Sequence, residues 1–567
     1  MKRLVRAGLG SRGPLAGLRP AGRGAAIRLR PAAPKAARLT RMSLGKRRPE
    51  GTGNGDEAAA RLVRALLEPH RYPHEAGPIE LIETHISWVL LTGPYAYKLK
   101  KPLKLPFLDF STLERRRHFC EEELRLNRRF APDLYLDVVP IGGTADAPRV
   151  GETPAIEYAV RLRQFDPAAT ADRILVRGAI GPDAIVRLAE AIARFHERSA
   201  PAQGRPPGPL ALANVDELER TLADAGLPEP VGPLRDWTRA QAAKLAESFA
   251  GRQQARAVRE THGDLHLENL VVIDGDIRPF DALEFDASMR SVDVVDETAF
   301  LVMDLKAHDR PDLAFLFLNR YLEVTGDYPG MRLLRFYLVY RALVRAKVRA
   351  IKAVQARAPD PGARVGPYLA LARGLTEERS PLLVITRGLS GSGKTTVAGE
   401  LMTRLPAVRI RSDLERKRLH GLAPDARGDL GVGQGRYDSA ATERTYQTLA
   451  AFAEHALAGG LNVIVDATFA SRDRRTAFRS LAERCGARFA ILDCVAPEET
   501  LRARIRARAA ARSDASEATE AVLDAQLSHA EPPTGDEAPY VQRVDTSAEL
   551  DYRSLAASLL RTEKRDQ

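Results

Sequence analysis

One loop motif constrains this chain more than any other stretch. Residues 382–402 read LLVITRGLSGSGKTTVAGELM, which places the pattern G-x-x-x-x-G-K-T between an apolar run and a helix-forming run. Glycines in such a loop let successive backbone N–H groups turn onto phosphate oxygens at a helix N-terminus. The pattern therefore predicts a phosphate-binding loop of the Walker A type, with a strand before it and a helix after it. The predicted ATP-binding residues of this loop are Gly388, Ser390, Gly391, Ser392, Gly393, Lys394, Thr395 and Thr396.

Individual side chains of this motif have predicted roles. Lys394 is expected to reach the β- and γ-phosphates and to be catalytic, while the Thr395 hydroxyl is expected to bind Mg²⁺. The apolar run LNVIVD ends at Asp466, a Walker-B-like position for a second metal ligand. ATP and Mg²⁺ are the expected cofactors.

Strand-like and helix-like runs alternate through the C-terminal part of the chain. Repeated strand-then-helix order predicts a parallel sheet with crossover helices, here a P-loop domain with a five-stranded parallel sheet over residues 381–563. The five strand-like runs are LLVIT, AVRI, LNVIVD, RFAILD and YVQRVD.

Charged residues near this motif suggest how an acceptor could be bound. Asp413 and Arg416 stand three apart at a helix start, which suits an acid that orients a hydroxyl and an arginine that binds an anionic group. A helix-capping aspartate beside a solvated arginine is the alternative. Arg504, Arg508 and Arg512 share one helical face and predict a lid over the phosphates, although a solvent-exposed face fits nearly as well. The glycine-rich residues 420–437 are expected to form a mobile loop over the acceptor site.

A second constellation lies earlier in the chain. Residues 262–269 read HGDLHLEN and place Asp264 and Asn269 at the D-x-x-x-x-N spacing of a kinase catalytic loop. Asp264 is the predicted catalytic aspartate and Asn269 a predicted Mg²⁺ ligand. Asp281 follows a predicted hairpin and takes the position of a second metal ligand. His262 and His266 are expected to support the loop, and Asp296 to tether it.

An upstream lysine and glutamate complete this predicted ATP site. In AYKLKK, Ala96 and Lys98 share a strand face, as in the V-A-I-K pattern, although Lys100 lies on that face too. On the next helix, Glu123 falls within an apolar stripe, where a carboxylate needs a partner such as Lys98. A solvated basic strand and a helix-rim glutamate are the alternatives.

The layout around this constellation predicts a bilobal domain. A small sheet-rich part precedes a larger helical part over residues 57–375, which is the arrangement of protein-kinase-like folds. The predicted fold class is multidomain, α+β followed by α/β. Residues 1–56 are expected to be a disordered basic tail or the product of a mis-assigned start.

These motifs carry a family resemblance. HGDLHLEN and the following FDALEFD resemble the aminoglycoside phosphotransferase and choline kinase-like superfamily, and the second half resembles P-loop kinases of the polynucleotide kinase, gluconate kinase and zeta-toxin type. The whole chain resembles bacterial bifunctional aminoglycoside phosphotransferase/ATP-binding proteins. The resemblance implies that Asp264 is catalytic and that Asn269 and Asp281 hold Mg²⁺. The chain lacks a G-x-G-x-x-G loop, and no acidic cluster suits a polycationic aminoglycoside, so that acceptor does not follow.

Charge and cysteine content limit the remaining choices. Residues 1–49 hold 14 Lys or Arg and no Asp or Glu, against a net charge of +12 for the chain, so the rest is close to neutral. A nucleic-acid-binding body would more often be basic itself. The three cysteines have no paired spacing, which argues against disulfides or a zinc site and favours a reducing, cytoplasmic setting.

Three functional hypotheses follow. The first is a cytoplasmic phosphotransferase with two kinase modules, each acting on a hydroxyl of an unidentified small-molecule acceptor. The second makes the first module a catalytically silent sensing or docking domain for the P-loop kinase. The third is a nucleic-acid 5′-hydroxyl kinase recruited by the basic tail, which the near-neutral body does not favour. No membrane partner is expected, and the sequence leaves the oligomeric state open.

Overall fold

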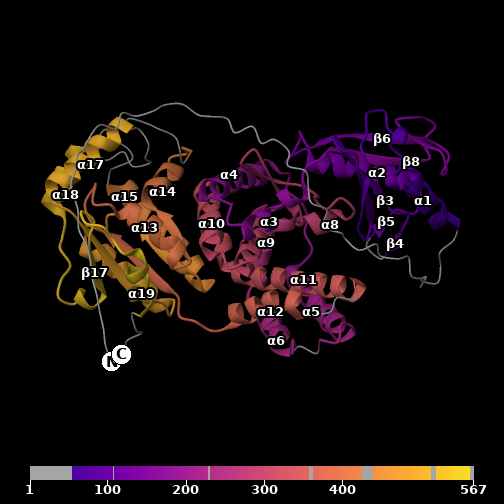
Figure 1. The fold of residues 1–567 in the computed structure, drawn as a ribbon. Helices are drawn as coiled ribbons and strands as arrows, with labels where there is room; N and C mark the ends of the chain where they lie inside the picture. The colour runs from indigo at the N-terminus through magenta and orange to yellow at the C-terminus, as the bar shows by residue number, and fades with distance from the viewer. Residues whose placement is uncertain are drawn as a thin grey trace, which may run out of the picture. The chain divides into compact units, whose positions relative to one another are not determined.

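The computed structural model describes residues 54–105, 108–227, 230–356, 360, 362–423, 439–511 and 519–561 (Figure 1). The described chain after Gly53 forms one compact unit. We refer to residues 54–376 as the N-terminal module and to residues 381–561 as the P-loop module. The predicted basic tail, except its last residues, and nearly all of the predicted loop over 420–437 lie outside the described residues.

The N-terminal module begins with a sheet-rich lobe. Its antiparallel sheet has the strand order β1-β2-β3-β8-β6-β7, and helix α2 packs against β6 and β8 (Figure 1). The elements of this lobe are α1 (Asn54–Ala65), β1 (Glu80–Glu83), β2 (Ser87–Leu91), β3 (Tyr95–Lys100), β4 (Lys104–Leu105), β5 (Leu108–Asp109), α2 (Leu113–Asn127), β6 (Tyr135–Gly143), β7 (Pro148–Val150) and β8 (Glu157–Arg163).

A helical lobe follows, with two short hairpin-like ladders. Its elements are α3 (Ala171–Val176), α4 (Pro182–Arg198), α5 (Pro207–Asp224), α6 (Gly232–Lys244), α7 (Ala246–Gln254), β9 (Val258–Glu260), β10 (Leu270–Ile273), β11 (Asp276–Pro279), α8 (Ala287–Arg290), β12 (Ser291–Asp293), α9 (Val294–Ala307), α10 (Pro311–Thr325), α11 (Met331–Ala356) and α12 (Gly362–Thr376).

Helix α9 is the buried centre of this lobe. Every residue from Val294 to Leu305 is buried, and a helix that is buried on all sides belongs in a core. Its acidic residues therefore lie in the interior, where carboxylates need partners of opposite charge or N–H donors. These partners come from the loop over 262–269 and from α11.

The P-loop module has one five-stranded sheet. All strands run parallel in the order β14-β15-β13-β16-β17, and β13 is buried along five of its six residues because helices cover both faces. Its elements are β13 (Leu382–Arg387), α13 (Lys394–Arg404), β14 (Ala407–Arg411), α14 (Ser412–Leu419), α15 (Ser439–Ala458), β15 (Asn462–Asp466), α16 (Arg472–Arg484), β16 (Arg488–Val495), α17 (Glu498–Ala511), α18 (Glu520–His529), β17 (Val541–Asp545) and α19 (Tyr552–Arg561).

Helix α10 contacts the edge strand β14 of this sheet. The Asn319 amide donates to the Ala407 carbonyl at 2.9 Å and accepts from the Arg409 N–H at 2.6 Å. Glu323, one turn further along α10, pairs with Arg409. Two backbone groups of this sheet edge are thus paired with a side chain of the N-terminal module.

The predicted fold class is confirmed: a bilobal, kinase-like module precedes a P-loop module with a five-stranded parallel sheet. The predicted hairpin turns at Asp274 and Gly275, both with positive φ. The predicted sheet-rich part is confirmed as a six-stranded antiparallel sheet.

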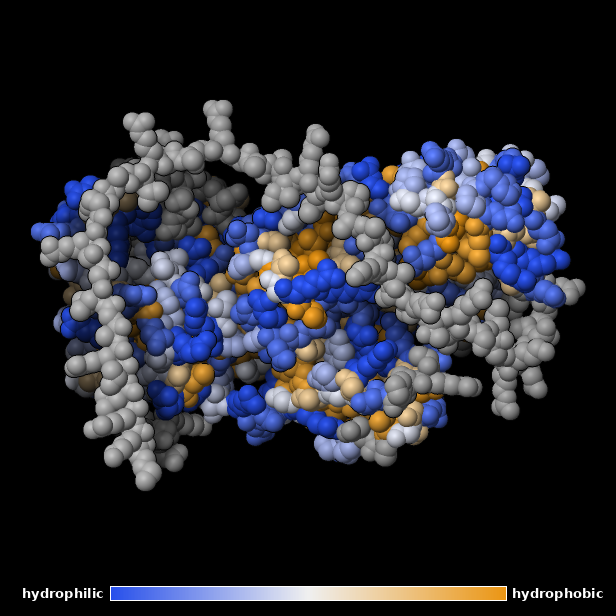
Figure 2. Space-filling model, viewed as in Figure 1, coloured by the Kyte–Doolittle hydropathy of each residue, from blue (hydrophilic) through white to orange (hydrophobic). Residues whose placement is uncertain are grey.

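Surface hydropathy is mixed. On the face shown in Figure 2, hydrophobic residues form separate patches between hydrophilic ones. Among the described helices, none combines the length and apolar character needed to cross a bilayer.

Candidate functional sites

The first candidate site lies between the two lobes of the N-terminal module. Lys98 on β3 donates to Glu123 on α2, with 2.8 Å between Nζ and Oε1, and to the Asp281 carboxylate. Burial alone would lower the pKa of Lys98, but the charges of Asp281 and Glu123 outweigh it and raise that pKa well above its usual value. The structure thus brings these three predicted residues together around a permanently charged ammonium.

Lys100 has a different position. Its side chain is fully buried and pairs with both Glu123 and Glu284. Because Lys98 is the lysine that contacts Asp281, it is the one that faces the predicted metal site. Glu284 was not predicted as a partner of Lys100. The feature of the sequence that could have indicated it is that Glu284 lies three residues after Asp281.

The catalytic-loop residues also come together. Asn269 Nδ2 donates to Asp264 Oδ2 at 2.8 Å, and His266 Nε2 lies 3.2 Å from the same oxygen. Burial tends to raise the pKa of Asp264, yet the charges of His266 and Arg345 hold that pKa well below its usual value. Asp264 is therefore ionised throughout the physiological range.

The loop is held by acids of helix α9 other than the predicted one. Glu297 accepts from the His262 N–H at 2.8 and 3.0 Å, and Asp304 accepts from the Leu267 N–H at 2.9 Å. Asp296 instead forms a two-pronged ion pair with Arg341 at 2.6 and 2.8 Å. The predicted tethering role of Asp296 is therefore wrong, because its carboxylate faces α11 rather than the loop backbone. His262 supports the loop through its Nε2, which lies 3.0 Å from the Phe280 carbonyl.

Asp281 has an unusual backbone conformation that its surroundings fix. Its φ is +61°, in the left-handed region that non-glycine residues seldom adopt. The Asp281 N–H donates to the Tyr135 hydroxyl at 3.0 Å, and the Ala282 N–H donates to Asn127 Oδ1 at 2.9 Å. Sequence reasoning missed Tyr135 and Asn127, since both act through contacts about 150 residues away along the chain.

The donor set fits Mg²⁺ bound together with ATP. The side-chain nitrogen of Asn269 donates to Asp264, so the side-chain oxygen of Asn269 is available to bind a metal ion. Burial tends to raise the pKa of Asp281, but the charge of Lys98 holds that pKa below its usual value, so this carboxylate is ionised. Among the described residues no group of three or more His, Cys, Asp or Glu side chains could hold a metal. Mg²⁺ commonly binds one or two carboxylates and completes its shell with phosphate oxygens and water, and Asn269 and Asp281 would hold it only in that shared way.

The second candidate site is a cavity of about 420 Å³ around the glycine loop. It brings together most of the predicted residues of this module with several that were not predicted. The predicted lining residues are Ser390, Gly391, Gly393, Lys394, Thr395, Thr396, Asp413, Arg416, Asp466, Arg504 and Arg508, and the others include Ser412, Thr442, Tyr446, Thr468 and Gln526. Arg512 lies outside the described residues.

The loop backbone requires its glycines. Gly388 has a φ of +142°, and a Cβ there would lie 2.4 Å from the Cys494 carbonyl oxygen. Gly391 and Gly393 also have positive φ. Lys394 folds back onto the Leu389 carbonyl at 2.8 Å, and burial lowers its pKa.

Asp466 lines this cavity, and the arginines of β14 lie near it. Burial raises the pKa of Asp466 despite the nearby positive charges of Arg411, Arg409 and Lys394. Arg411 Nε lies 3.9 Å from Asp466, and Arg411 Nη1 lies 3.8 Å from Glu323 of the N-terminal module. Thr395 and Asp466 are an oxygen pair that Mg²⁺ could share with phosphates.

The predicted acceptor and lid residues differ in their surroundings. Asp413 lies in the first turn of α14, and the N-cap residue of this helix is Arg411. Asp413 therefore does not cap the helix, and that alternative is wrong. Arg416 donates to Thr442 Oγ1 at 3.4 Å. Arg504 donates to the Gly391 carbonyl and to Thr546, so it braces the glycine loop from one side of the cavity.

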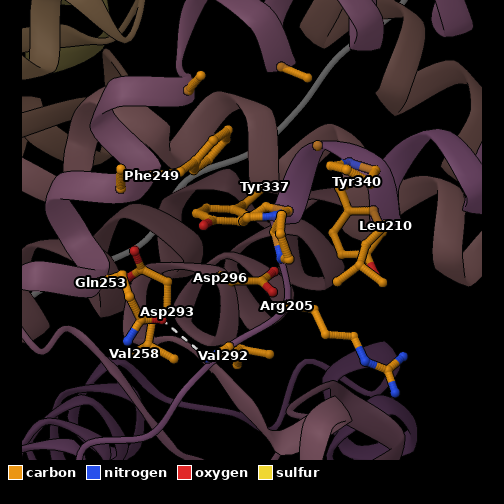
Figure 3. A pocket seen from close by; sticks show the side chains of 18 of the residues that line it. Arg205, Leu210, Phe249, Gln253, Val258, Val292, Asp293, Asp296, Tyr337 and Tyr340 are labelled. Atoms are coloured by element: carbon orange, nitrogen blue, oxygen red, sulfur yellow. Dashed lines mark hydrogen bonds between the residues drawn. The ribbon is translucent and has the colours of Figure 1, made fainter.

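A third cavity, of about 500 Å³, lies in the helical lobe (Figure 3). Its walls come from residues 203–206 and the start of α5, from α6, α7 and α11, and from the β9–β12 ladder. No residue from the sequence-based site predictions other than Asp296 lines it.

Comparisons with known proteins identify a family model and relatives that match this chain. Residues 383–533 match the family model AAA_33, described as an AAA domain. The chain is 30% identical over 461 residues to "Uncharacterized protein Rv2004c" of Mycobacterium tuberculosis (strain ATCC 25618 / H37Rv), which covers 79% of this chain and 90% of that protein. "Uncharacterized protein Mb2027c" of Mycobacterium bovis matches to the same extent.

Two solved structures match separate parts of the chain. A choline/ethanolamine kinase family protein from Mesorhizobium loti is 14% identical and covers 57% of this chain and 95% of its own, with a TM-score of 0.36. The Mycobacterium tuberculosis APS kinase CysC, in complex with AMPPNP and APS, is 21% identical and covers 33% of this chain and 98% of its own, with a TM-score of 0.24.

Proposed function

Since this chain belongs to the same family as the mycobacterial proteins Rv2004c and Mb2027c, and joins a kinase-like module to a P-loop kinase domain, we propose that it is an ATP- and Mg²⁺-dependent phosphotransferase with two active modules. Each module transfers the γ-phosphate of ATP to a hydroxyl of a small-molecule acceptor. The observation that carries the proposal is that each module brings together the side chains predicted to bind phosphate and to orient an acceptor.

In the N-terminal module, the chain supplies positioning and charge. Lys98, fixed by Glu123, contacts the phosphates, and Asn269 and Asp281 hold Mg²⁺, which neutralises charge on the phosphates when bound. Asp264 accepts a hydrogen bond from the acceptor hydroxyl. Because the pKa of Asp264 is held so low, this carboxylate is a weak base, and its main contribution is to orient the hydroxyl for in-line attack.

In the P-loop module, the backbone N–H groups of the glycine loop and Lys394 bind the β- and γ-phosphates. Asp413 orients the acceptor hydroxyl, and Arg416 binds a polar or anionic part of the acceptor. Arg508, which lines the same cavity, stabilises charge on the transferring phosphoryl group.

The test is transfer from γ-labelled ATP with Mg²⁺ to a mixed panel of sugar, alcohol and oligonucleotide acceptors. Wild type is compared with Asp264→Asn, Lys394→Ala and the double variant, each checked for an unchanged melting temperature. Each single change should remove a different labelled product. If neither wild type nor variants label any acceptor, and no labelled phosphate is released to water, the proposal is wrong.

The contacts between α10 and β14 favour one second candidate. Glu323 of the N-terminal module lies beside Arg409 and Arg411, whose charges act on Asp466. A catalytically silent N-terminal module could therefore sense a ligand and regulate the P-loop site. In that case Lys394→Ala abolishes all labelling, whereas Asp264→Asn leaves the set of products unchanged.

A further inference from the structure

The cavity in the helical lobe has an apolar lining and balanced charges. Carbon-rich side chains form most of its surface, including Leu210, Leu212, Phe249, Val258, Val292 and Tyr340 (Figure 3). A cavity of about 500 Å³ is within the size range of small-molecule sites. Its lining therefore suits a ligand with an apolar body.

Every charged side chain that lines this cavity has a partner of opposite charge. At the floor, Asp293 pairs with Arg252 at 2.7 Å, and Asp296 pairs with Arg341 at 2.6 Å. The two arginines that line the cavity, Arg205 and Arg239, pair with Asp286 at 3.2 Å and with Asp236 at 2.9 Å, respectively. Arg252 also pairs with Asp327, which does not line the cavity. Because each charged side chain of the lining is paired, the ligand that fits is neutral.

One polar group remains available in the cavity. The Tyr337 hydroxyl makes no hydrogen bond with the described residues, although the side chain is almost fully buried. Burial, together with the charges of Asp293 and Asp296, raises the pKa of Tyr337 well above its usual value, so the hydroxyl keeps its proton. A hydroxyl that lines the cavity and has no partner in the described protein can donate to a ligand that carries an acceptor oxygen.

Helix α11 connects this cavity to Asp264. Tyr337, Arg341 and Arg345 are four residues apart and therefore share one helix face, about 12 Å from end to end. Tyr337 lines the cavity, Arg341 pairs with its floor, and Arg345 Nη1 lies 3.1 Å from His266, the neighbour of Asp264. His266 Nε2 in turn lies 3.2 Å from Asp264 Oδ2, so the predicted catalytic carboxylate lies beyond the Arg345 end of this face.

We propose that this cavity binds the apolar body of the acceptor used by the N-terminal module, and that the acceptor is a neutral, elongated alcohol whose hydroxyl reaches Asp264. This inference rests on the proposed function. In the reaction, the acceptor oxygen forms a bond to the γ-phosphorus, while the bond from that phosphorus to the β,γ-bridging oxygen breaks and ADP leaves with the electron pair. The hydroxyl proton is released to solvent, while Asp264 orients the hydroxyl.

The position of two alanines makes the cavity easy to block. Ala246, on α7, lines the cavity but is exposed, so a tryptophan there extends into the opening without entering the core. Ala240, on α6, is equally exposed and does not line the cavity. Ala246→Trp and Ala240→Trp are therefore a matched pair for the full-length protein.

The experiment measures binding of a series of ω-phenoxyalkanols of increasing chain length, whose ether oxygen can accept a hydrogen bond from Tyr337, by titration calorimetry. It also measures transfer of label from γ-labelled ATP to the same alcohols. Wild type should bind the neutral alcohols, Ala240→Trp should bind them equally, and Ala246→Trp should bind at least tenfold more weakly. Tyr337→Phe should weaken binding about fivefold, the effect of one lost hydrogen bond. Transfer should require a minimum chain length and should be lost in Asp264→Asn.

Three results would overturn the inference. These are no binding by wild type, equal binding by Ala246→Trp and wild type, and tighter binding of a trimethylammonium analogue than of the neutral alcohol. Release of labelled phosphate to water, compared in wild type and Asp264→Asn, reports separately whether the module is active. If the alcohols bind but are not labelled, while labelled phosphate is released to water in an Asp264-dependent way, the cavity is not an acceptor site. Absence of any Asp264-dependent turnover contradicts the proposed function of the module instead.

Discussion

Lys98 and Lys100 share one face of β3 and one carboxylate, Glu123, yet only Lys98 also contacts Asp281. Lys98 Nζ lies 2.8 Å from Glu123 Oε1 and retains some exposure to the cleft, whereas Lys100 is fully buried against Glu284. Two neighbouring lysines therefore have separate tasks.

The first prediction separates these tasks by mutation. Lys98→Ala should weaken ATP binding to the N-terminal module by tenfold or more with a small effect on stability, because a partly exposed cation is lost from the cleft. Lys100→Ala should lower the free energy of unfolding by about 3–5 kcal/mol, since it leaves the buried carboxylate of Glu284 without its cation and Glu123 with Lys98 alone. The measurements are nucleotide titration in a Lys394→Ala background and urea denaturation. Equal loss of stability in both variants would contradict the separate roles of Lys98 in ATP binding and Lys100 in stability.

The second prediction concerns the pH dependence of stability through Glu268. This glutamate lies in the catalytic loop beside Arg345 and Arg349. Burial tends to raise its pKa, but these arginines dominate and lower the pKa from 4.5 to about 2. A lowered folded-state pKa means that the stabilisation is fully present above about pH 5 and is lost as the pH falls toward 2.

Glu268→Gln should therefore lower the free energy of unfolding by about 2–3 kcal/mol at pH 7. The difference from wild type should shrink as the pH is lowered below about 5. Urea denaturation at a series of pH values from 7 down to 3.5 checks this. Exposed Glu217, which pairs with Lys347, is the control: Glu217→Gln should change the free energy by less than about 1 kcal/mol. A difference for Glu268→Gln that stays constant with pH would show that the charge of this carboxylate is not what stabilises the loop.

Local patterns were sufficient to predict the elements of both sites. The glycine loop lies between its own strand and helix, and Lys98, Glu123, Asp264 and Asn269 sit on elements whose periodicity or spacing can be read directly. The five parallel strands followed from the alternation of apolar runs. These features depend on neighbours within about 30 residues of each other.

Long-range partners could not be predicted in this way. Asn127 and Tyr135 hold the backbone around Asp281, and Glu323 pairs with Arg409, across separations of 86 to 155 residues. The prediction for Asp296 was wrong for a related reason. The sequence indicates a buried helix with acidic residues, but it does not indicate which neighbour each acidic side chain faces. The face of each side chain is fixed only when the lobes pack.

The third prediction concerns the backbone of the glycine loop. Gly388→Ala should abolish nucleotide binding to the P-loop module, because a Cβ would lie 2.4 Å from the Cys494 carbonyl oxygen and the φ of +142° is unfavourable for alanine. Gly374, in α12, has open space around its Cβ position, so Gly374→Ala should raise the free energy of unfolding by about 0.4–1 kcal/mol. Nucleotide titration and urea denaturation distinguish the two. Normal ATP affinity in Gly388→Ala would refute the steric argument.

The fourth prediction concerns the contact between the modules through Asn319. Its buried amide pairs both the Ala407 carbonyl and the Arg409 N–H of the edge strand β14. Asn319→Leu would leave two buried backbone groups without partners and should lower the free energy of unfolding by about 2–5 kcal/mol. Asn214, in α5, is a matched control, because its buried side-chain amide makes no hydrogen bond within the described residues.

Asn214→Leu removes an unpaired polar group from the interior and should leave stability unchanged or raise it. Both variants exchange a buried asparagine for leucine, so any difference between them reports the hydrogen bonds and not the change in side-chain shape. Urea denaturation followed by circular dichroism gives the two free energies. If Asn214→Leu destabilises the protein as much as Asn319→Leu does, the pairing at β14 does not stabilise the contact between the modules.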